Sequence, residues 1–156
     1  MGKINLQKVV IGGLIAGVVL NVVDFLVFSV VLKDQMAAAM TAIGKAPAPS
    51  GGQIAWFVFL DFLAGIFLVW LYAAVRPRMG AGPATAAKAG VAAWFLGNAL
   101  VTAFMWPMAI MPHSFMLTTM VIALIEWPLA AVIGAKFYTE GAGVSAGMGA
   151  GMGARM

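Results

Sequence analysis

Four apolar segments, each long enough to cross a lipid bilayer, constrain the fold of this chain more than any other feature. They cover roughly residues 8–32, 54–75, 86–110 and 115–138, and a spanning α-helix needs only about 20 predominantly apolar residues. Hydrophobic residues make up 63% of the 156-residue chain and charged residues only 9%, so the chain is too apolar for a water-soluble domain. The sequence therefore predicts an all-α fold, a bundle of four transmembrane helices within residues 1–138.

Basic residues predict the orientation of these helices, because Lys and Arg are retained on the cytoplasmic side of a membrane. If the N-terminus is inside, the outer side holds only Lys33 and Lys45. The inner side then holds Lys3, Lys8, Arg76, Arg78, Lys88, Lys136 and Arg155. Both termini are therefore predicted to be cytoplasmic. The net charge of +4 follows from this distribution and requires no nucleic-acid partner.

The segments between and after the spans carry their own signals. The apolar run that begins near residue 8 has about 25 residues and exceeds the apolar region of 7–15 residues in a typical signal peptide, so we expect an uncleaved anchor. Apolar residues at helical spacing predict a short helix on the outer surface over residues 34–43. Ser50 and Gln53 have the spacing of a capping box at the start of the second span. Residues 139–156 are rich in Gly, Ala and Met without hydrophobic periodicity and are predicted to be a disordered tail.

Aromatic residues lie near the ends of the predicted spans. Trp56 and Trp106 are near the outer ends, and Trp70, Tyr72 and Tyr138 are near the inner ends. Trp and Tyr are enriched at both membrane surfaces, where their rings lie among the lipid headgroups. We therefore expect these five residues to form an aromatic belt.

Three carboxylic acids lie inside the predicted spans, namely Asp24, Asp61 and Glu126, and the remaining span contains Asn98. An Asp at the centre of a spanning helix costs about 2.5–3.5 kcal/mol, and no Lys or Arg lies deep in a span to pair with these acids. With a rise of about 1.5 Å per residue, the four side chains lie roughly 10–20 Å from the outer ends of their spans. The sequence therefore predicts that they converge, sharing a proton, a cation or a hydrogen-bond network that includes Asn21.

Small residues accompany these polar side chains on the faces of the helices. On the first span, Gly13 and Gly17 form a GxxxG pair within the same arc as Asn21 and Asp24. Small residues let two membrane helices approach closely. The residues expected to pack in this way are Gly13, Gly17, Gly65, Gly90, Gly97, Ala130 and Gly134. The polar groups are therefore predicted to face helix contacts rather than lipid.

Residue types exclude several kinds of chemistry. The chain has no Cys, so it forms no disulfide and binds no iron–sulfur cluster. His113 is the only histidine, which excludes bis-histidine haem and disfavours a zinc site. Nucleophile triads, HExxH motifs and glycine-rich phosphate loops are also absent from the sequence. We therefore predict no enzymatic activity, no cofactor and no metal site.

Two stretches, GGLIAGVVLNVVDF and VWLYAAVRPRMGAGPATA, together with the SGG sequence before the second span, resemble a family of small bacterial four-span membrane proteins whose function is not established. The resemblance covers most of residues 8–138 and implies a location in the bacterial inner membrane. The four-helix architecture is also similar to that of small multidrug-resistance transporters, which place an essential acid in the first helix. The chain lacks their sequence motifs, so that similarity concerns the architecture alone.

Two functions remain open from the sequence. In the first, the protein is a structural or accessory subunit that binds partner transmembrane helices through its small-residue faces, and the acids act as hydrogen-bonding groups between helices. In the second, the protein is a proton- or cation-coupled carrier of small solutes that uses Asp24, Asp61 and Glu126, since ionisable residues inside a membrane are functional candidates. In both, we expect a homodimer or a complex with other membrane subunits in the lipid bilayer.

Overall fold

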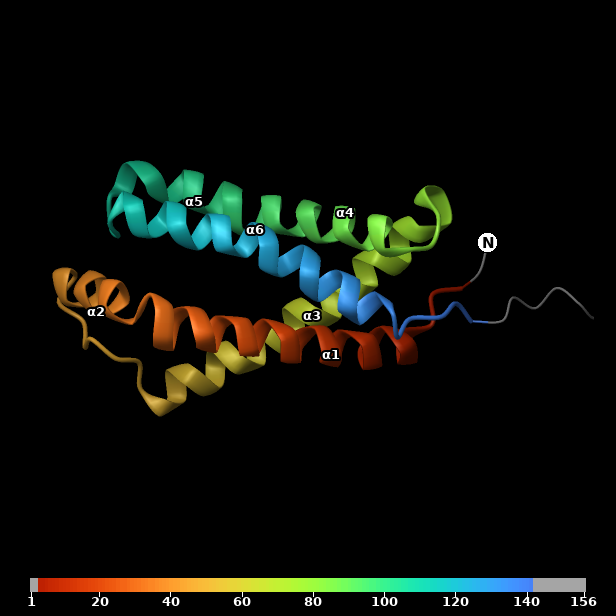
Figure 1. Cartoon of the computed structure of the whole chain (residues 1–156), viewed down its shortest axis with the longest axis horizontal. Helices are drawn as coiled ribbons and strands as arrows, with labels where there is room; N and C mark the ends of the chain where they lie inside the picture. Colours follow the sequence, from red (N-terminus) through yellow and green to blue (C-terminus); the bar gives the residue numbers. More distant parts are fainter. Residues whose placement is uncertain (1–2, 142–156) are drawn as a thin grey trace, which may run out of the picture.

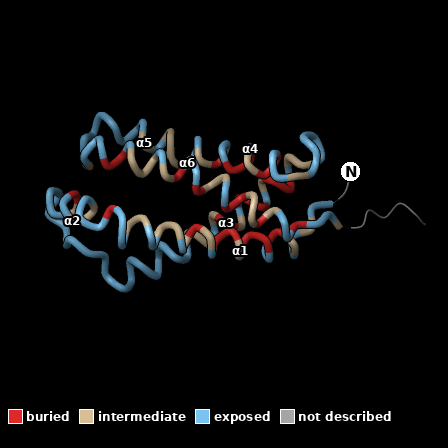
Figure 2. Tube along the Cα trace, viewed as in Figure 1, coloured by how far each residue is buried: buried red, intermediate tan, exposed pale blue. Residues whose placement is uncertain are grey.

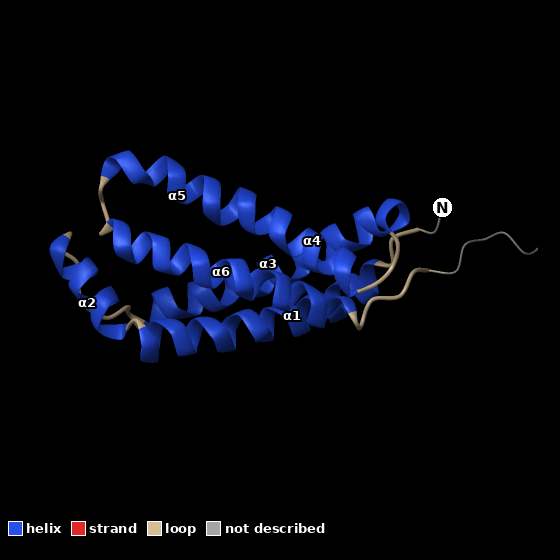
Figure 3. Cartoon of the chain, turned by 45° about the horizontal axis from the view of Figure 1, so that its top comes forward, coloured by secondary structure: helices blue, strands red, loops and turns tan. Residues whose placement is uncertain are grey.

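The structure, a computed structural model, describes residues 3–141 of the chain. Within this range, the chain is helical without any strand, and four of its helical stretches are long and apolar enough to cross a membrane. These stretches are Leu6–Val31, Gly51–Met79, Pro83–Met108 and His113–Ala135. The protein is therefore a multi-pass helical membrane protein, and the predicted all-α bundle of four spanning helices is confirmed (Figures 1 and 3).

Two of the four stretches combine several kinds of helix. The first consists of α1 (Leu6–Leu26) and a π-helical segment, η1 (Val27–Val31), and the short helix α2 (Lys33–Ala42) follows it. The third consists of α4 (Pro83–Trp94), the π-helical segment η2 (Phe95–Ala99), α5 (Leu100–Met105) and a 3-10 turn, η3 (Trp106–Met108). The other two stretches are α3 (Gly51–Met79) and α6 (His113–Ala135). Helix α2 lies where the sequence predicted a short helix.

Local sequence explains how α3 begins and ends. The Ser50 hydroxyl accepts a hydrogen bond from the Gln53 N–H, and the Gln53 side chain accepts one from the Ser50 N–H, which is the predicted capping box. At the other end, Gly80 and Gly82 have φ angles of 83° and 137°, which residues with a Cβ rarely adopt. The two glycines therefore allow the tight turn into α4. Helix α3 is longer at both ends than the predicted span of 54–75, and it continues through Pro77.

The hydrophobic core lies at one end of the bundle. We call this the terminal end, because it holds the start of α1 and the end of α6 (Figure 1). The core takes residues from α1, the second half of α3, α4, the last part of α6 and the segment that follows it: Val9, Ala16, Leu20, Leu68, Val69, Tyr72, Ala73, Ala86, Ala89, Ala93, Ala130, Ala131 and Tyr138. We call the opposite end the hairpin end, because it holds the short connection from α5 to α6 (Figure 1). There, residues 51–60 of α3 are all exposed (Figure 2). The helices are therefore packed tightly over only part of their length.

Glycines bring the helices of this tight region into backbone contact. Helix α1 meets α3 at Gly13, Gly17 and Gly65, where a Cβ added to Gly65 would lie 2.9 Å from Gly17 Cα. It meets α6 at Gly12 and Gly134, where a Cβ on Gly12 would lie 2.6 Å from the Gly134 carbonyl oxygen. The small-residue faces of these helices therefore contact other helices of the same chain.

Helix α4 packs on α6 in the same way. A Cβ on Gly90 would lie 2.8 Å from the nitrogen of Pro128, and Ala130 is fully buried nearby in the core. One hydrogen bond also joins the two helices, because Trp94 Nε1 donates to the Met120 carbonyl at 3.0 Å. The resulting bundle holds α6 between α1 and α4.

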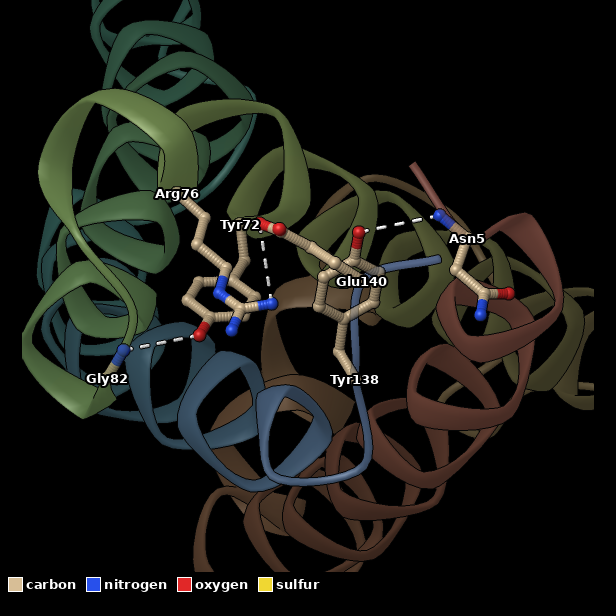
Figure 4. A network of polar contacts seen from close by, with 6 residues as sticks. All are labelled: Asn5, Tyr72, Arg76, Gly82, Tyr138 and Glu140. Carbon is tan, nitrogen blue, oxygen red and sulfur yellow. Dashed lines mark hydrogen bonds and ion pairs between the residues drawn. The ribbon is translucent and has the colours of Figure 1, made fainter. Parts of the chain in front are cut away.

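Polar side chains tie the terminal end together (Figure 4). Tyr138 OH accepts a hydrogen bond from the Asn5 N–H, and Tyr72 OH accepts one from the Gly82 N–H. Arg76 lies 5.6 Å from the centre of the Tyr138 ring and forms an ion pair with Glu140 at 3.6 Å. These contacts link the start of α1, the end of α3, the α3–α4 turn and the segment after α6.

This network corrects the expected aromatic belt. Tyr72 and Tyr138 are buried in the core and contact each other edge to face, instead of facing the lipid headgroups. Each hydroxyl has a backbone partner, which is how a buried tyrosine is usually accommodated. The predicted disordered tail begins at residue 139, and nearly all of it, residues 142–156, lies outside the described residues.

Candidate functional site: an acidic cavity between the helices

A cavity of about 200 Å³ lies between the helices, beside the core. Its polar lining comes from all four spanning stretches: Asp24 in α1, Asp61 in α3, Asn98 in η2, and Thr119 and Glu126 in α6. Its apolar lining consists of Leu20, Val27, Phe28, Ile122, Ala123 and Trp127. The structure therefore brings together the three acids and Asn98, as their depths in the sequence suggested.

Glu126 is the most deeply buried of the three acids. Its side chain is only 5% exposed, whereas Asp24 and Asp61 are half-buried. Among the described residues, Glu126 Oε1 has no hydrogen-bond partner. A buried polar atom without a partner loses its hydration without compensation, at about 1–3 kcal/mol. Glu126 therefore lines the cavity and also carries an oxygen without a hydrogen-bond partner in the described structure.

The neutral polar residues of the cavity differ in what they offer. The Thr119 hydroxyl donates to the carbonyl oxygens of Phe115 and Met116, at 3.1 and 3.0 Å. Because its proton is used in this way, its oxygen can only accept a hydrogen bond from a ligand. Asn98 contributes an amide, which both donates and accepts. Asn21, which we expected in the same network, does not line the cavity. Its amide donates to the Gly17 carbonyl at 2.9 Å, one turn earlier in α1, and this bond satisfies it locally.

Two aromatic residues of the wall, Phe28 and Trp127, were not expected from the sequence. The Trp127 ring packs at Gly97, where an added Cβ would lie 3.0 Å from the indole. Gly97 therefore leaves room for this ring. A signal was present in the sequence, namely a small residue beside the polar Asn98, but it did not indicate which aromatic residue it accommodates.

Both π-helical segments border the cavity. Val27 and Phe28 lie in η1, and Asn98 lies in η2. A π-helical turn inserts one residue into an α-helix and is found frequently at functional sites. The insertion changes which residues share a face of the helix. A wheel drawn at 100° per residue therefore fails beyond Leu26 in the first span and beyond Trp94 in the third.

The ionisable residues that line the cavity are all acidic. In the part of the chain that the structure describes, no Lys, Arg or His lines it. Within that same part, no group of three or more His, Cys, Asp or Glu residues lies close enough to hold a metal ion. The acids surround the space instead of forming a compact cage. Such a site can bind protons, or a cation that is large enough to reach several walls.

No family model matches the chain, and neither a curated protein nor a solved structure is significantly similar to it.

Proposed function

We propose that the protein is a proton- or cation-coupled carrier of small solutes, with Asp24, Asp61 and Glu126 as its shared binding site. One observation carries the proposal: carboxyl groups from three separate helices line the same cavity within the membrane-spanning region. Acids at such depth are rare in membrane helices, and where they occur they mark ion pathways and proton relays.

Hydrogen bonding between helices explains this arrangement less well. Acids that hold helices together are expected to have partners. Glu126 Oε1 has none among residues 3–141, although the residue lines the cavity. This oxygen therefore does not link Glu126 to a neighbouring helix.

The distribution of packing also supports a carrier. The core and the network of Figure 4 close the terminal end, while residues 51–60 of α3 are all exposed (Figure 2). A carrier needs its site closed toward one side of the membrane while it is accessible from the other. We propose that the terminal end is cytoplasmic, from the excess of basic residues there, and that the membrane is the bacterial inner membrane.

The carrier predicts that protons enter the cavity even when no solute is present. Purified protein is reconstituted into liposomes, adsorbed on a solid-supported membrane and exposed to a rapid change in pH. Protons that bind to the acids inside the low-dielectric region should produce a transient charge displacement. The triple variant Asp24→Asn, Asp61→Asn, Glu126→Gln should not produce it.

A matched control is Asp34→Asn in α2, which makes the same chemical change at an exposed acid outside the cavity. It should retain the full displacement. Circular dichroism and size-exclusion chromatography establish that all variants are folded. Equal displacements from the unmodified protein and from a folded triple variant would overturn the proposal.

The alternative, an accessory subunit that binds partner helices through small-residue faces, meets a difficulty. Gly12, Gly13, Gly65, Gly90 and Gly134 are already in contact with helices of the same chain. Partner helices would have to use exposed surfaces instead, such as the first ten residues of α3. Native mass spectrometry of gently extracted protein distinguishes a complex with other subunits from a homodimer.

A further inference from the structure

We propose that the cavity binds small apolar ammonium ions, meaning protonated amines whose hydrocarbon part is about the size of one benzene ring. This inference rests on the proposed function, because it names the solute class of the same site. Four properties of the cavity support it: its volume, its charge, its buried acid and its aromatic wall.

The volume limits the size of the solute. A cavity of about 150 Å³ inside a protein accommodates benzene, whereas sites for drug-sized molecules have about 300–1,000 Å³. The cavity here has about 200 Å³. It therefore accommodates one ring or a short branched chain that carries one polar group.

Charge and geometry favour an organic cation over a metal ion. Three acids line the cavity, and among the described residues no basic side chain opposes them. A bare metal ion needs several ligands at distances of about 2.0–2.6 Å, but residues 3–141 contain no acid or histidine cluster suited to one. An ammonium group needs fewer acceptors, because it donates at most three hydrogen bonds.

The carboxyl group of Glu126 defines where the ammonium group binds, because it is the most deeply buried acid of the cavity wall. Glu126 is 5% exposed, and its Oε1 lacks a partner in the described structure. An N–H donor of the solute would bond to the Glu126 carboxyl group, and a hydrogen bond between charged groups is the stronger kind. Thr119, in the same helix, adds a neutral acceptor because its hydroxyl proton is already used.

The remaining wall suits the hydrocarbon part. Phe28 and Trp127 are joined there by Leu20 and Ile122, so the wall also offers apolar surface beside the acids. Trp is the aromatic side chain that attracts cations most strongly through its ring face. Trp127 directly follows Glu126, so one segment of α6 presents both the acid and the ring.

The test uses benzylammonium, which has one ring and one ammonium group, and benzyl alcohol, its neutral counterpart of nearly the same shape. Isothermal titration of the purified full-length protein in nanodiscs should show benzylammonium binding at least about tenfold more tightly than the alcohol, since a charged hydrogen bond is lost. Glu126→Gln should remove most of this preference. Asp34→Asn, the acid outside the cavity, should retain it.

The comparison of the two ligands needs no variant, so it remains decisive even if Glu126→Gln does not fold. Equal affinities, or tighter binding of the alcohol, would overturn the inference. The pH-jump measurement separates this failure from failure of the proposed function. Normal charge displacement without benzylammonium binding refutes the solute class alone, whereas loss of both refutes the carrier as well.

Discussion

Replacement of Glu126 by Met should stabilise the fold. The two side chains are similar in length, and Glu126 is 5% exposed with Oε1 unpartnered among the described residues. Removal of a buried polar atom without a partner relieves about 1–3 kcal/mol. Since most substitutions destabilise a protein by about 1 kcal/mol, a gain at a buried site has the opposite sign to the usual result.

The free energy of unfolding is measured by titration with SDS in mixed micelles, followed by circular dichroism. We expect Glu126→Met to raise it by about 1–3 kcal/mol, the full penalty of the orphaned oxygen. Glu126→Gln is the matched control, because its amide keeps polar atoms at the same place and should gain much less. Both variants should reduce the charge displacement after a pH jump, because only Asp24 and Asp61 then remain to bind protons in the cavity, so stability and function should change in opposite directions in Glu126→Met.

The same measurement distinguishes a ligand site from a structural one. If Glu126 held two helices together by a hydrogen bond, Glu126→Met would lose that bond. Bonds of this kind contribute about 0.6 kcal/mol on average in membrane proteins and at most about 1.7. A loss of stability in this range would refute the reasoning from the unpartnered oxygen.

Three further predictions concern the packing, the cavity and the topology. Gly65→Ala places a Cβ against the backbone of α1 and should lower the free energy of unfolding by about 1–3 kcal/mol. Gly52→Ala on the same helix has nothing within 4 Å of the added Cβ and should not lower it. Equal stabilities of the two variants would contradict the close contact at Gly65. Gly97→Ala should leave the fold intact but weaken benzylammonium binding by pressing on the indole 3.0 Å away, and unchanged affinity would exclude this wall from the site. Because the chain has no Cys, single Ser50→Cys and Gly80→Cys variants can be labelled in whole bacterial cells; an impermeant maleimide should reach only the first, and the reverse pattern would invert the proposed orientation.

The sequence was sufficient for the parts of the fold that depend on local signals. The spans of apolar residues and the capping box at Ser50 appear as predicted, because each is determined by its own stretch of sequence. The boundaries of α3 were less predictable. Its last turn, including Pro77, continues beyond the apolar run, because helix formation does not require every residue to lie in the membrane.

The site was predictable from its acids but not from its walls. An intramembrane carboxylate is conspicuous in any apolar segment, and depth along the helix indicated that Asp24, Asp61 and Glu126 lie together. Phe28 and Trp127 are unremarkable among many apolar residues, and their orientation depends on tertiary contacts and on the π-helical turns. Asn21 does not line the cavity, and its amide has a local partner, which a helical wheel does not reveal.

The position of the cavity relative to the core explains how the fold tolerates a buried acid that lacks a hydrogen-bond partner. In α1 the last core residue is Leu20 and Asp24 follows one turn later, while in α6 Glu126 precedes the core residue Ala130 by one turn. In α4 the core ends at Ala93, shortly before Asn98. Each of these polar residues therefore lies just beyond the tightly packed half.

This arrangement separates stability from function along the bundle axis. The packed half, with its glycine contacts and the network of Figure 4, holds the four helices in register. The acids beside it can then remain without partners, because the fold does not depend on their interactions. A cavity surrounded by core on every side would open only by disrupting that core. Here the residues toward the hairpin end are largely exposed, so the proposed carrier would admit a solute from that end while the packed half stays intact.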